Sequence, residues 1–217
     1  MSKLLVKPAA ASQVHQVTPQ SAGWTYVGFA VHDLNVGETL ECQQAGRELC
    51  IVILTGTANV CVGLQSWDNV GGRNSVFVDQ PPGAVYVPAG EAISITALDA
   101  VEVAVCSAPG QGNSGAARLI DAAMMSQEVR GEGTNTRYVR NILPETEAAD
   151  GLLVVEVITP SGHWSSYPPH KHDRDASPEE TLLEETYYHR LNPASGYAHQ
   201  RVYTDDRILD VTLSAED

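Results

Sequence analysis

Short apolar runs separated by turn residues fill the first half of the chain. The runs recur at about the 8–12-residue spacing that is typical of β-sandwiches and β-barrels. The breaks between them, such as Asn35-Val36-Gly37 and Pro81-Pro82-Gly83, contain residues that suit tight turns. The predicted strands are residues 24–31, 48–54, 58–62, 75–78, 84–87, 93–97 and 101–106. The pattern therefore predicts an all-β N-terminal half.

A stretch rich in Gly, Ser and Ala, residues 108–117, interrupts this pattern and indicates a linker or wide loop. A short helix is predicted over residues 116–125, and strand-like runs resume at residues 136–142 and 152–159. The stretch is therefore a candidate domain boundary.

Composition and charge narrow the classes of partner. Hydrophobic residues make up 43% of the 217 residues and charged residues 18%, as in a globular protein with a core. The 13 basic residues are outnumbered by 27 acidic ones, so the formal net charge is −14. Such a surface repels phosphate backbones and anionic membranes. We therefore expect neither a nucleic acid nor a membrane as a partner.

The cysteines and the N-terminus indicate in which cellular compartment the protein is expected. The four cysteines form no CxxC pair and stand among apolar neighbours, which indicates buried, reduced thiols. They are Cys42, Cys50, Cys61 and Cys106. The N-terminus lacks the apolar stretch of a signal peptide, and no run approaches the ~20 apolar residues that cross a bilayer. The sequence therefore predicts a cytoplasmic protein.

Histidines gather in the second half, where five of the seven fall between residues 163 and 199. His170 and His172 are two residues apart, so on a strand both side chains point to one face. Neutral imidazoles suit zinc, iron, nickel, copper and, less strongly, manganese, so this pair is a candidate metal clip. The alternative is two solvent-facing polar residues on an edge strand.

A third ligand is predicted in the strand-like residues 182–189. If Leu183 faces the interior, the period of two places Glu185, Tyr187 and His189 on that face and turns Glu184 away. His170, His172 and Glu185 then form a set of two histidines and one carboxylate with positions open for a substrate. The alternative is that Glu184 and Glu185 are a solvated pair at the strand entrance.

Several strings of residues resemble one family over nearly the whole chain. They are WTYVGF from Trp24, RELC from Arg47, AVYVPAG from Ala84, NTRYV from Asn135, WSSYPPHKHD from Trp164 and QRVYTDDR from Gln200. The sequence resembles the 5-deoxy-glucuronate isomerase family of bacterial myo-inositol catabolism. PPHKHD and QRVYTDD together are far more specific than the histidine pair alone.

The resemblance implies an all-β bicupin, two related β-barrels in one chain. Residues 1–110 would be a cupin-like barrel without a site, 111–135 a linker with a short helix, and 136–217 the metal-binding cupin barrel. By similarity to the related pectin-pathway ketol-isomerases, the metal ligands fall on His170, His172 and Glu185, with Glu184 as the alternative carboxylate.

The fourth ligand of the family lies in a Gly-Tyr-His-Pro string beyond the position of Asp217. We therefore expect the second barrel to lack its closing strands and the 217-residue chain to have reduced activity, with His199 or water as a substitute ligand. Residues 186–190 and 202–204 are expected to pair in one sheet with an uncovered edge. Such an edge predicts self-association into a homo-oligomer.

The implied function is a metal-dependent aldose–ketose isomerase that converts 5-deoxy-glucuronate to 5-dehydro-2-deoxy-gluconate. The implied cofactor is a divalent transition metal, zinc first, with manganese, iron or nickel as alternatives. Arg201 is the predicted partner of the sugar-acid carboxylate. Further candidates for contact with substrate or protons are Lys171, Tyr187 and Tyr203. The alternative functions are a cupin Fe(II) dioxygenase and a non-catalytic sugar-acid-binding protein.

Overall fold

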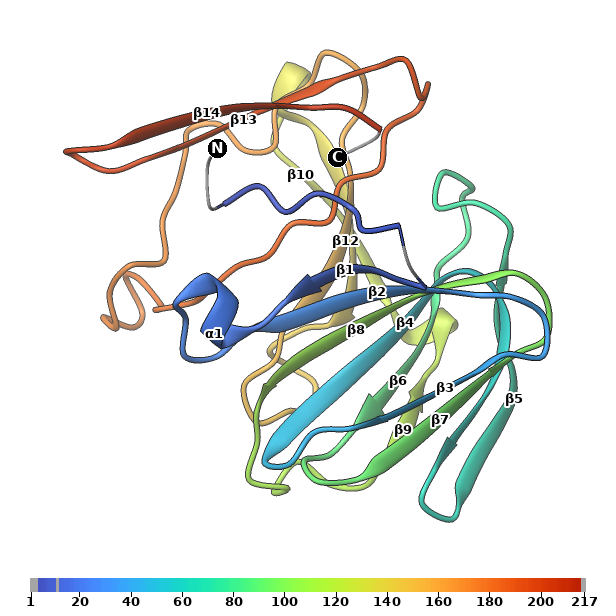
Figure 1. The fold of residues 1–217 in the computed structure, drawn as a ribbon. Coiled ribbons are helices and arrows are strands. Elements are labelled where there is room, and N and C mark those ends of the chain that lie inside the picture. Colours follow the sequence, from blue (N-terminus) through green and yellow to red (C-terminus); the bar gives the residue numbers. More distant parts are fainter. Residues whose placement is uncertain (1–3, 11, 216–217) are drawn as a thin grey trace.

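The computed structural model describes residues 4–10 and 12–215, and nearly all regular structure in them is β-strand (Figure 1). This confirms the predicted all-β class. One helix, α1 (Pro19–Ala22), precedes the second strand. The strands of the first half are β1 (Gln13–Val17), β2 (Gly28–Leu34), β3 (Thr39–Gln43), β4 (Arg47–Val62), β5 (Gln65–Arg73), β6 (Gly83–Val87), β7 (Ala92–Ala97), β8 (Val101–Pro109) and β9 (Arg118–Ile120).

The long strand β4 belongs to two layers. Its first part lies in the order β1-β2-β8-β4-β6-β9, and its second part pairs with β5 and with β7, which in turn pairs with β3. The change of layer falls at Gly56, whose φ of +82° is disfavoured for other residues. A Cβ at this position would also collide with the carbonyl oxygen of Ala100. The glycine therefore permits one strand to serve both layers.

Alternate side chains of β4 supply two hydrophobic cores. Leu49, Ile51 and Ile53 point between the two layers of the first half. Cys50 and Val52 point to the opposite face of the first layer, where they meet side chains from the second half of the chain. Those partners are Met125, Ile142, Leu143 and Leu152. The first layer is thus buried on both faces, which explains its continuous apolar runs.

The second half consists of a small sheet and a hairpin. The sheet has the order β10 (Ser126–Arg130), β11 (Arg137–Leu143) and β12 (Val154–Ile158). β13 (Ala198–Tyr203) and β14 (Ile208–Leu213) form the hairpin. The division into two cupin barrels with boundaries at residues 110 and 135 stays a prediction.

Several predicted elements are wrong. Residues 75–78 form a turn, because the Ser75 hydroxyl accepts the amide hydrogen bond of Phe77 at 3.2 Å. The helix predicted over 116–125 is replaced by β9, at the edge of the first layer, and the 3₁₀ turn Ala122–Met124. Residues 186–190 do not pair with 202–204, because β13 pairs with β14 instead.

All four cysteines are free thiols, as predicted. Cys50 is buried, and burial raises the pKa of its thiol. Cys61 is exposed near the end of β4, so the prediction of burial is wrong at this position, and Cys42 and Cys106 are half-buried. None of the helices in the described residues is long and apolar enough to span a bilayer.

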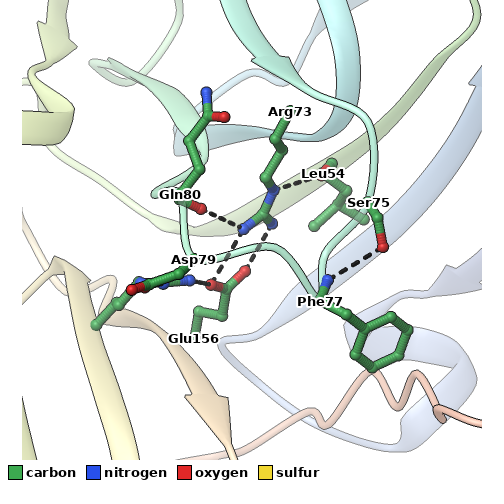
Figure 2. Close-up of polar contacts among 8 residues, drawn as sticks. Leu54, Arg73, Ser75, Phe77, Asp79, Gln80 and Glu156 are labelled. Carbon is green, nitrogen blue, oxygen red and sulfur yellow. Dashed lines mark hydrogen bonds and ion pairs between the residues drawn. The ribbon is translucent and has the colours of Figure 1, made fainter.

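An ionic cluster that is buried except for Asp79 joins the two halves (Figure 2). The guanidinium of Arg73, at the end of β5, is fully buried and donates to the Leu54 carbonyl at 2.6 Å. Its two terminal nitrogens donate to both carboxylate oxygens of Glu156 on β12, at 3.1 and 2.6 Å. Two parallel hydrogen bonds of this kind fix the orientation of the Glu156 carboxylate as well as its distance from Arg73.

Arg140 on β11 completes the ionic cluster. Its Nη1 donates to Glu156 at 2.8 Å and its Nη2 to Asp79 at 2.6 Å. Glu156 therefore lies between two guanidinium groups, one from each half of the chain. This arrangement sets how the sheet β10–β12 sits on the first layer.

Replacement of Arg73 by Met should destabilise the fold. It would remove one of the two charges that compensate Glu156 and leave the Leu54 carbonyl without its donor, and breaking a buried pair costs about 3–5 kcal/mol. Urea unfolding should show the loss as a lower midpoint. Arg130→Met is the matched control, because Arg130 pairs with Glu128 at the exposed surface and should change the midpoint little. Equal midpoints for the two variants would contradict a buried ionic tie.

Candidate metal centre

Three predicted ligands converge in the second half of the chain. The ligand atoms of His170, His172 and Glu185 all lie within 4.8 Å of one another. The two imidazole rings are edge to face with centroids 5.1 Å apart, and His172 Nε2 is 3.9 Å from Glu185 Oε1. The two histidines follow Pro168 and Pro169, which have no amide hydrogen to donate to a sheet. The histidine pair is accordingly outside any strand, contrary to the prediction.

Neighbouring oxygens orient the two imidazoles. His172 Nδ1 lies 3.1 Å from the carbonyl oxygen of Thr181. A carbonyl only accepts, so Nδ1 carries the proton and the lone pair of Nε2 is left on the side of Glu185. His170 Nδ1 lies 2.9 Å from the hydroxyl of Ser166, which can donate or accept.

A closed loop separates the histidines from Glu185. The buried carboxylate of Glu180 accepts hydrogen bonds from the amides of Asp173 and Arg174 at 2.7 and 3.0 Å and from Arg174 Nε at 2.8 Å. Where the loop ends, the amide of Leu183 donates to the carbonyl of His172 at 3.1 Å. The loop therefore returns the chain to its starting point and brings Glu185 beside His172.

Tyr187 and His189 lie on the same side of the segment as Glu185. The Tyr187 hydroxyl donates to Glu185 Oε2 at 2.9 Å, and the His189 ring stacks on the Tyr187 ring at 6.1 Å. Burial, and then the charge of Glu185, raise the pKa of Tyr187 well above its usual value. Burial lowers the pKa of His189, whose Nε2 lies 3.1 Å from Gln200 Oε1. Tyr187 is therefore a neutral donor to the carboxylate, and His189 a neutral imidazole, near pH 7.

Glu184 points away from the histidines. Its carboxylate accepts hydrogen bonds from three consecutive amides, those of Thr25, Tyr26 and Val27, at 2.7, 2.7 and 2.9 Å. Partial burial acts to raise the pKa of Glu184, but these amides together outweigh it and hold the pKa below its usual value. Of the two adjacent glutamates, the structure thus brings Glu185 to the histidines.

The remaining predicted residues lie apart from this cluster or are exposed beside it. Lys171 is exposed between the two histidines. Arg201 on β13 is exposed and donates two hydrogen bonds to Asp210 on β14, at 2.7 and 3.0 Å. His199 Nε2 lies 3.4 Å from the same carboxylate, and Tyr203 is exposed at the end of β13. The hairpin β13–β14 thus pairs its own charges.

Three supporting residues were missed by the sequence reasoning. They are Ser166, Glu180 and Glu184 in its contact with the first half. The position of Ser166, four residues before His170, is a weak sequence signal. Apart from the Arg174 side chain on Glu180, the partners of the two glutamates are backbone amides, which leave no signature in the sequence.

The donor set fits a transition metal. Ligand atoms at 2.0–2.2 Å from a tetrahedral zinc ion lie roughly 3.3–3.6 Å apart, so the three side chains would have to close by about 1 Å for one ion to bind them all. Two imidazoles and one carboxylate are nitrogen and oxygen donors of the kind that zinc, iron and nickel accept. His170 and Glu185 are exposed, so an ion held here would be open to a small molecule.

Known proteins resemble this chain over most of its length. A 5-deoxy-glucuronate isomerase of Geobacillus kaustophilus is 51% identical over 216 residues, which are 98% of this chain and 78% of that protein. One from Bacillus subtilis strain 168 is 45% identical over 221 residues, 99% of this chain and 81% of that protein. The crystal structure of an IolB-like protein from Salmonella typhimurium LT2 superposes with a TM-score of 0.91 at 44% identity, covering 97% of this chain and 80% of that one. Residues 4–217 also match the profile of the KduI/IolB family, and with these relatives they show that the chain belongs to that family.

Proposed function

We propose that this protein is an aldose–ketose isomerase that converts 5-deoxy-glucuronate to 5-dehydro-2-deoxy-gluconate in myo-inositol catabolism. The observation that carries the proposal is the convergence of His170, His172 and Glu185 in a chain 51% identical to a protein named 5-deoxy-glucuronate isomerase. The substrate is accordingly a sugar acid with an aldehyde next to a hydroxyl group.

The proposed cofactor is a divalent transition metal, with zinc as the first choice and manganese, iron or nickel as alternatives. His170, His172 and Glu185 would hold it, with His172 contributing Nε2 because its Nδ1 proton faces the Thr181 carbonyl. A bound ion of this kind supplies positive charge that polarises carbonyl and hydroxyl oxygens. Three protein ligands would leave room for both substrate oxygens.

The protein's own groups control the protons and the charge around this site. The raised pKa of Tyr187 keeps its hydroxyl protonated, so its role in the resting site is to hold the Glu185 carboxylate rather than to act as a base. Lys171 is the exposed cation beside the ligands that could receive the substrate carboxylate. Arg201 would have to exchange Asp210 for that carboxylate, and Tyr203 stays a candidate from the same strand.

Protein purified without chelator should contain about one transition-metal ion per chain, because the three donors form one site. The variant His170→Ala/His172→Ala should lose the ion, as measured by elemental analysis, which also identifies the metal. His199→Ala is the control and should keep it, since His199 faces Asp210. Equal metal content in the double variant and the parent would contradict the assignment.

Incubation of the protein with 5-deoxy-glucuronate under nitrogen should convert the aldehyde of the sugar acid to a ketone. Proton NMR measures this conversion. A chelator should stop the reaction, and Glu185→Gln should reduce it by about 10–100-fold or more, the usual effect of disturbing a metal site. A strict requirement for oxygen would instead indicate a dioxygenase. Binding of the sugar acid without conversion would indicate a binding protein.

A further inference from the structure

The segment 184–190 sends alternate side chains to opposite sides without belonging to a sheet. Glu185 and Tyr187 lie on the side of the histidines. Glu184, Tyr188 and Arg190 lie on the other side and contact the first half of the chain. Figure 1 shows this part of the chain, in orange-red, passing over α1 and β1. The side that bears Glu185 is therefore fixed by the contacts of the opposite side with the first half of the chain.

The contact on the rear side that lies next to Glu185 in the chain is that of Glu184. The three amides that it binds belong to the turn between α1 and β2, residues 25–27. That turn is itself fixed, because Arg47 Nη2 donates to the Tyr26 carbonyl at 2.5 Å and to the Ser107 carbonyl at 3.0 Å. Hydrogen bonds to a charged carboxylate are about twice as strong as neutral ones. Glu184 thus ties the segment to a rigid part of the first layer.

A second contact lies four to six residues further on. The Tyr188 hydroxyl and Arg190 Nη1 both donate to Glu102 Oε1 on β8, each at 2.5 Å. The Tyr188 ring also packs against Phe29 of β2, with ring centroids 5.9 Å apart. These contacts hold the far end of the segment. Its near end, where Glu185 lies, is held by the Leu183 amide on the carbonyl of His172 and, on the rear side, by Glu184.

Glu185 has few restraints of its own. It is exposed, and its hydrogen bond in the described structure comes from Tyr187 on the same segment. The described residues around it belong to no strand, so no ladder of backbone hydrogen bonds fixes which of the two adjacent glutamates faces the histidines. We propose that Glu184 is a positioning residue for the metal ligand Glu185, so that the backbone amides of residues 25–27 in the first half set the geometry of the metal centre in the second. This inference rests on the proposed metal function.

Glu184→Gln should weaken metal binding, because it replaces an acceptor oxygen by an amide group that faces three N–H donors. We expect the apparent dissociation constant for Zn²⁺ to rise by about 10–100-fold, the usual effect of losing a residue that orients a ligand. The measurement is competition with a chromophoric chelator on metal-stripped 217-residue protein, with folding checked by circular dichroism. Glu179→Gln is the matched control, since Glu179 is exposed and makes no side-chain hydrogen bond among the described residues.

A double-mutant cycle separates positioning from a general loss of stability. If Glu184 acts through Glu185, then Glu184→Gln should cost almost nothing in a Glu185→Gln background, whereas independent effects would add. Where Glu184→Gln does not fold, Glu184→Asp keeps the charge on a shorter side chain and should weaken binding by a smaller factor. Parent-like affinity in the folded variant, or additive effects, would overturn the positioning role while leaving the proposed function intact. A parent that binds no Zn²⁺, Mn²⁺, Fe²⁺ or Ni²⁺ would overturn both.

Discussion

The second half of the chain is held to the first by carboxylates that reach across to backbone amides and guanidinium groups of the other half. Glu48 shows the principle: it is fully buried and accepts hydrogen bonds from the amides of Asp150, Gly151 and Leu152, each at 2.7 Å. A buried amide without an acceptor costs free energy, so irregular backbone can be buried only where an acceptor meets it. Glu184 does the same in the opposite direction, from the second half to the first. Together with Glu156 between its two arginines, these side chains position the elements that carry the candidate centre.

The side chains of Glu48, Glu156 and Glu184 therefore fix the positions of neighbouring segments, as a continuous sheet does in a simpler β-protein. In a sheet, the ladder of backbone hydrogen bonds fixes register and hence the face on which each side chain lies. Residues 170–190 have no such ladder in the described structure, yet alternate side chains of 184–190 still point to opposite sides. The partners of Glu184, Tyr188 and Arg190 on the rear side impose this alternation. As a result, Glu185 and Tyr187 point to the side of the histidines, as they would on a strand.

The sequence predicted the all-β class well because strands of the first half bury side chains on one or both faces and are bounded by turn residues. Local pattern reasoning failed at Ser75 and at Arg118. The Ser75 hydroxyl accepts a hydrogen bond from a nearby amide, and Arg118 begins a short strand at a sheet edge. Apolar periodicity does not record either of these contacts. At the candidate site, the spacing of the histidines and the alternation after Leu183 predicted the residues that converge. Glu184 binds backbone amides distant in sequence, and Glu180 binds two amides of its own loop besides the Arg174 side chain. No residue pattern reveals contacts with backbone amides.

The closed loop between His172 and Glu185 has a consequence for how the sequence can change. Its two ends meet at the hydrogen bond between the Leu183 amide and the His172 carbonyl, and Glu180 ties its beginning to its end. Between these ties, Ala176 and Glu180 exchange backbone hydrogen bonds at 3.0 and 3.2 Å, so residues 176–180 form a closed turn. The spacing of the donor atoms is thus set by these closing hydrogen bonds and not only by the number of residues between the ligands. A change in the length of this loop would leave the donors in place only where the closing hydrogen bonds are kept.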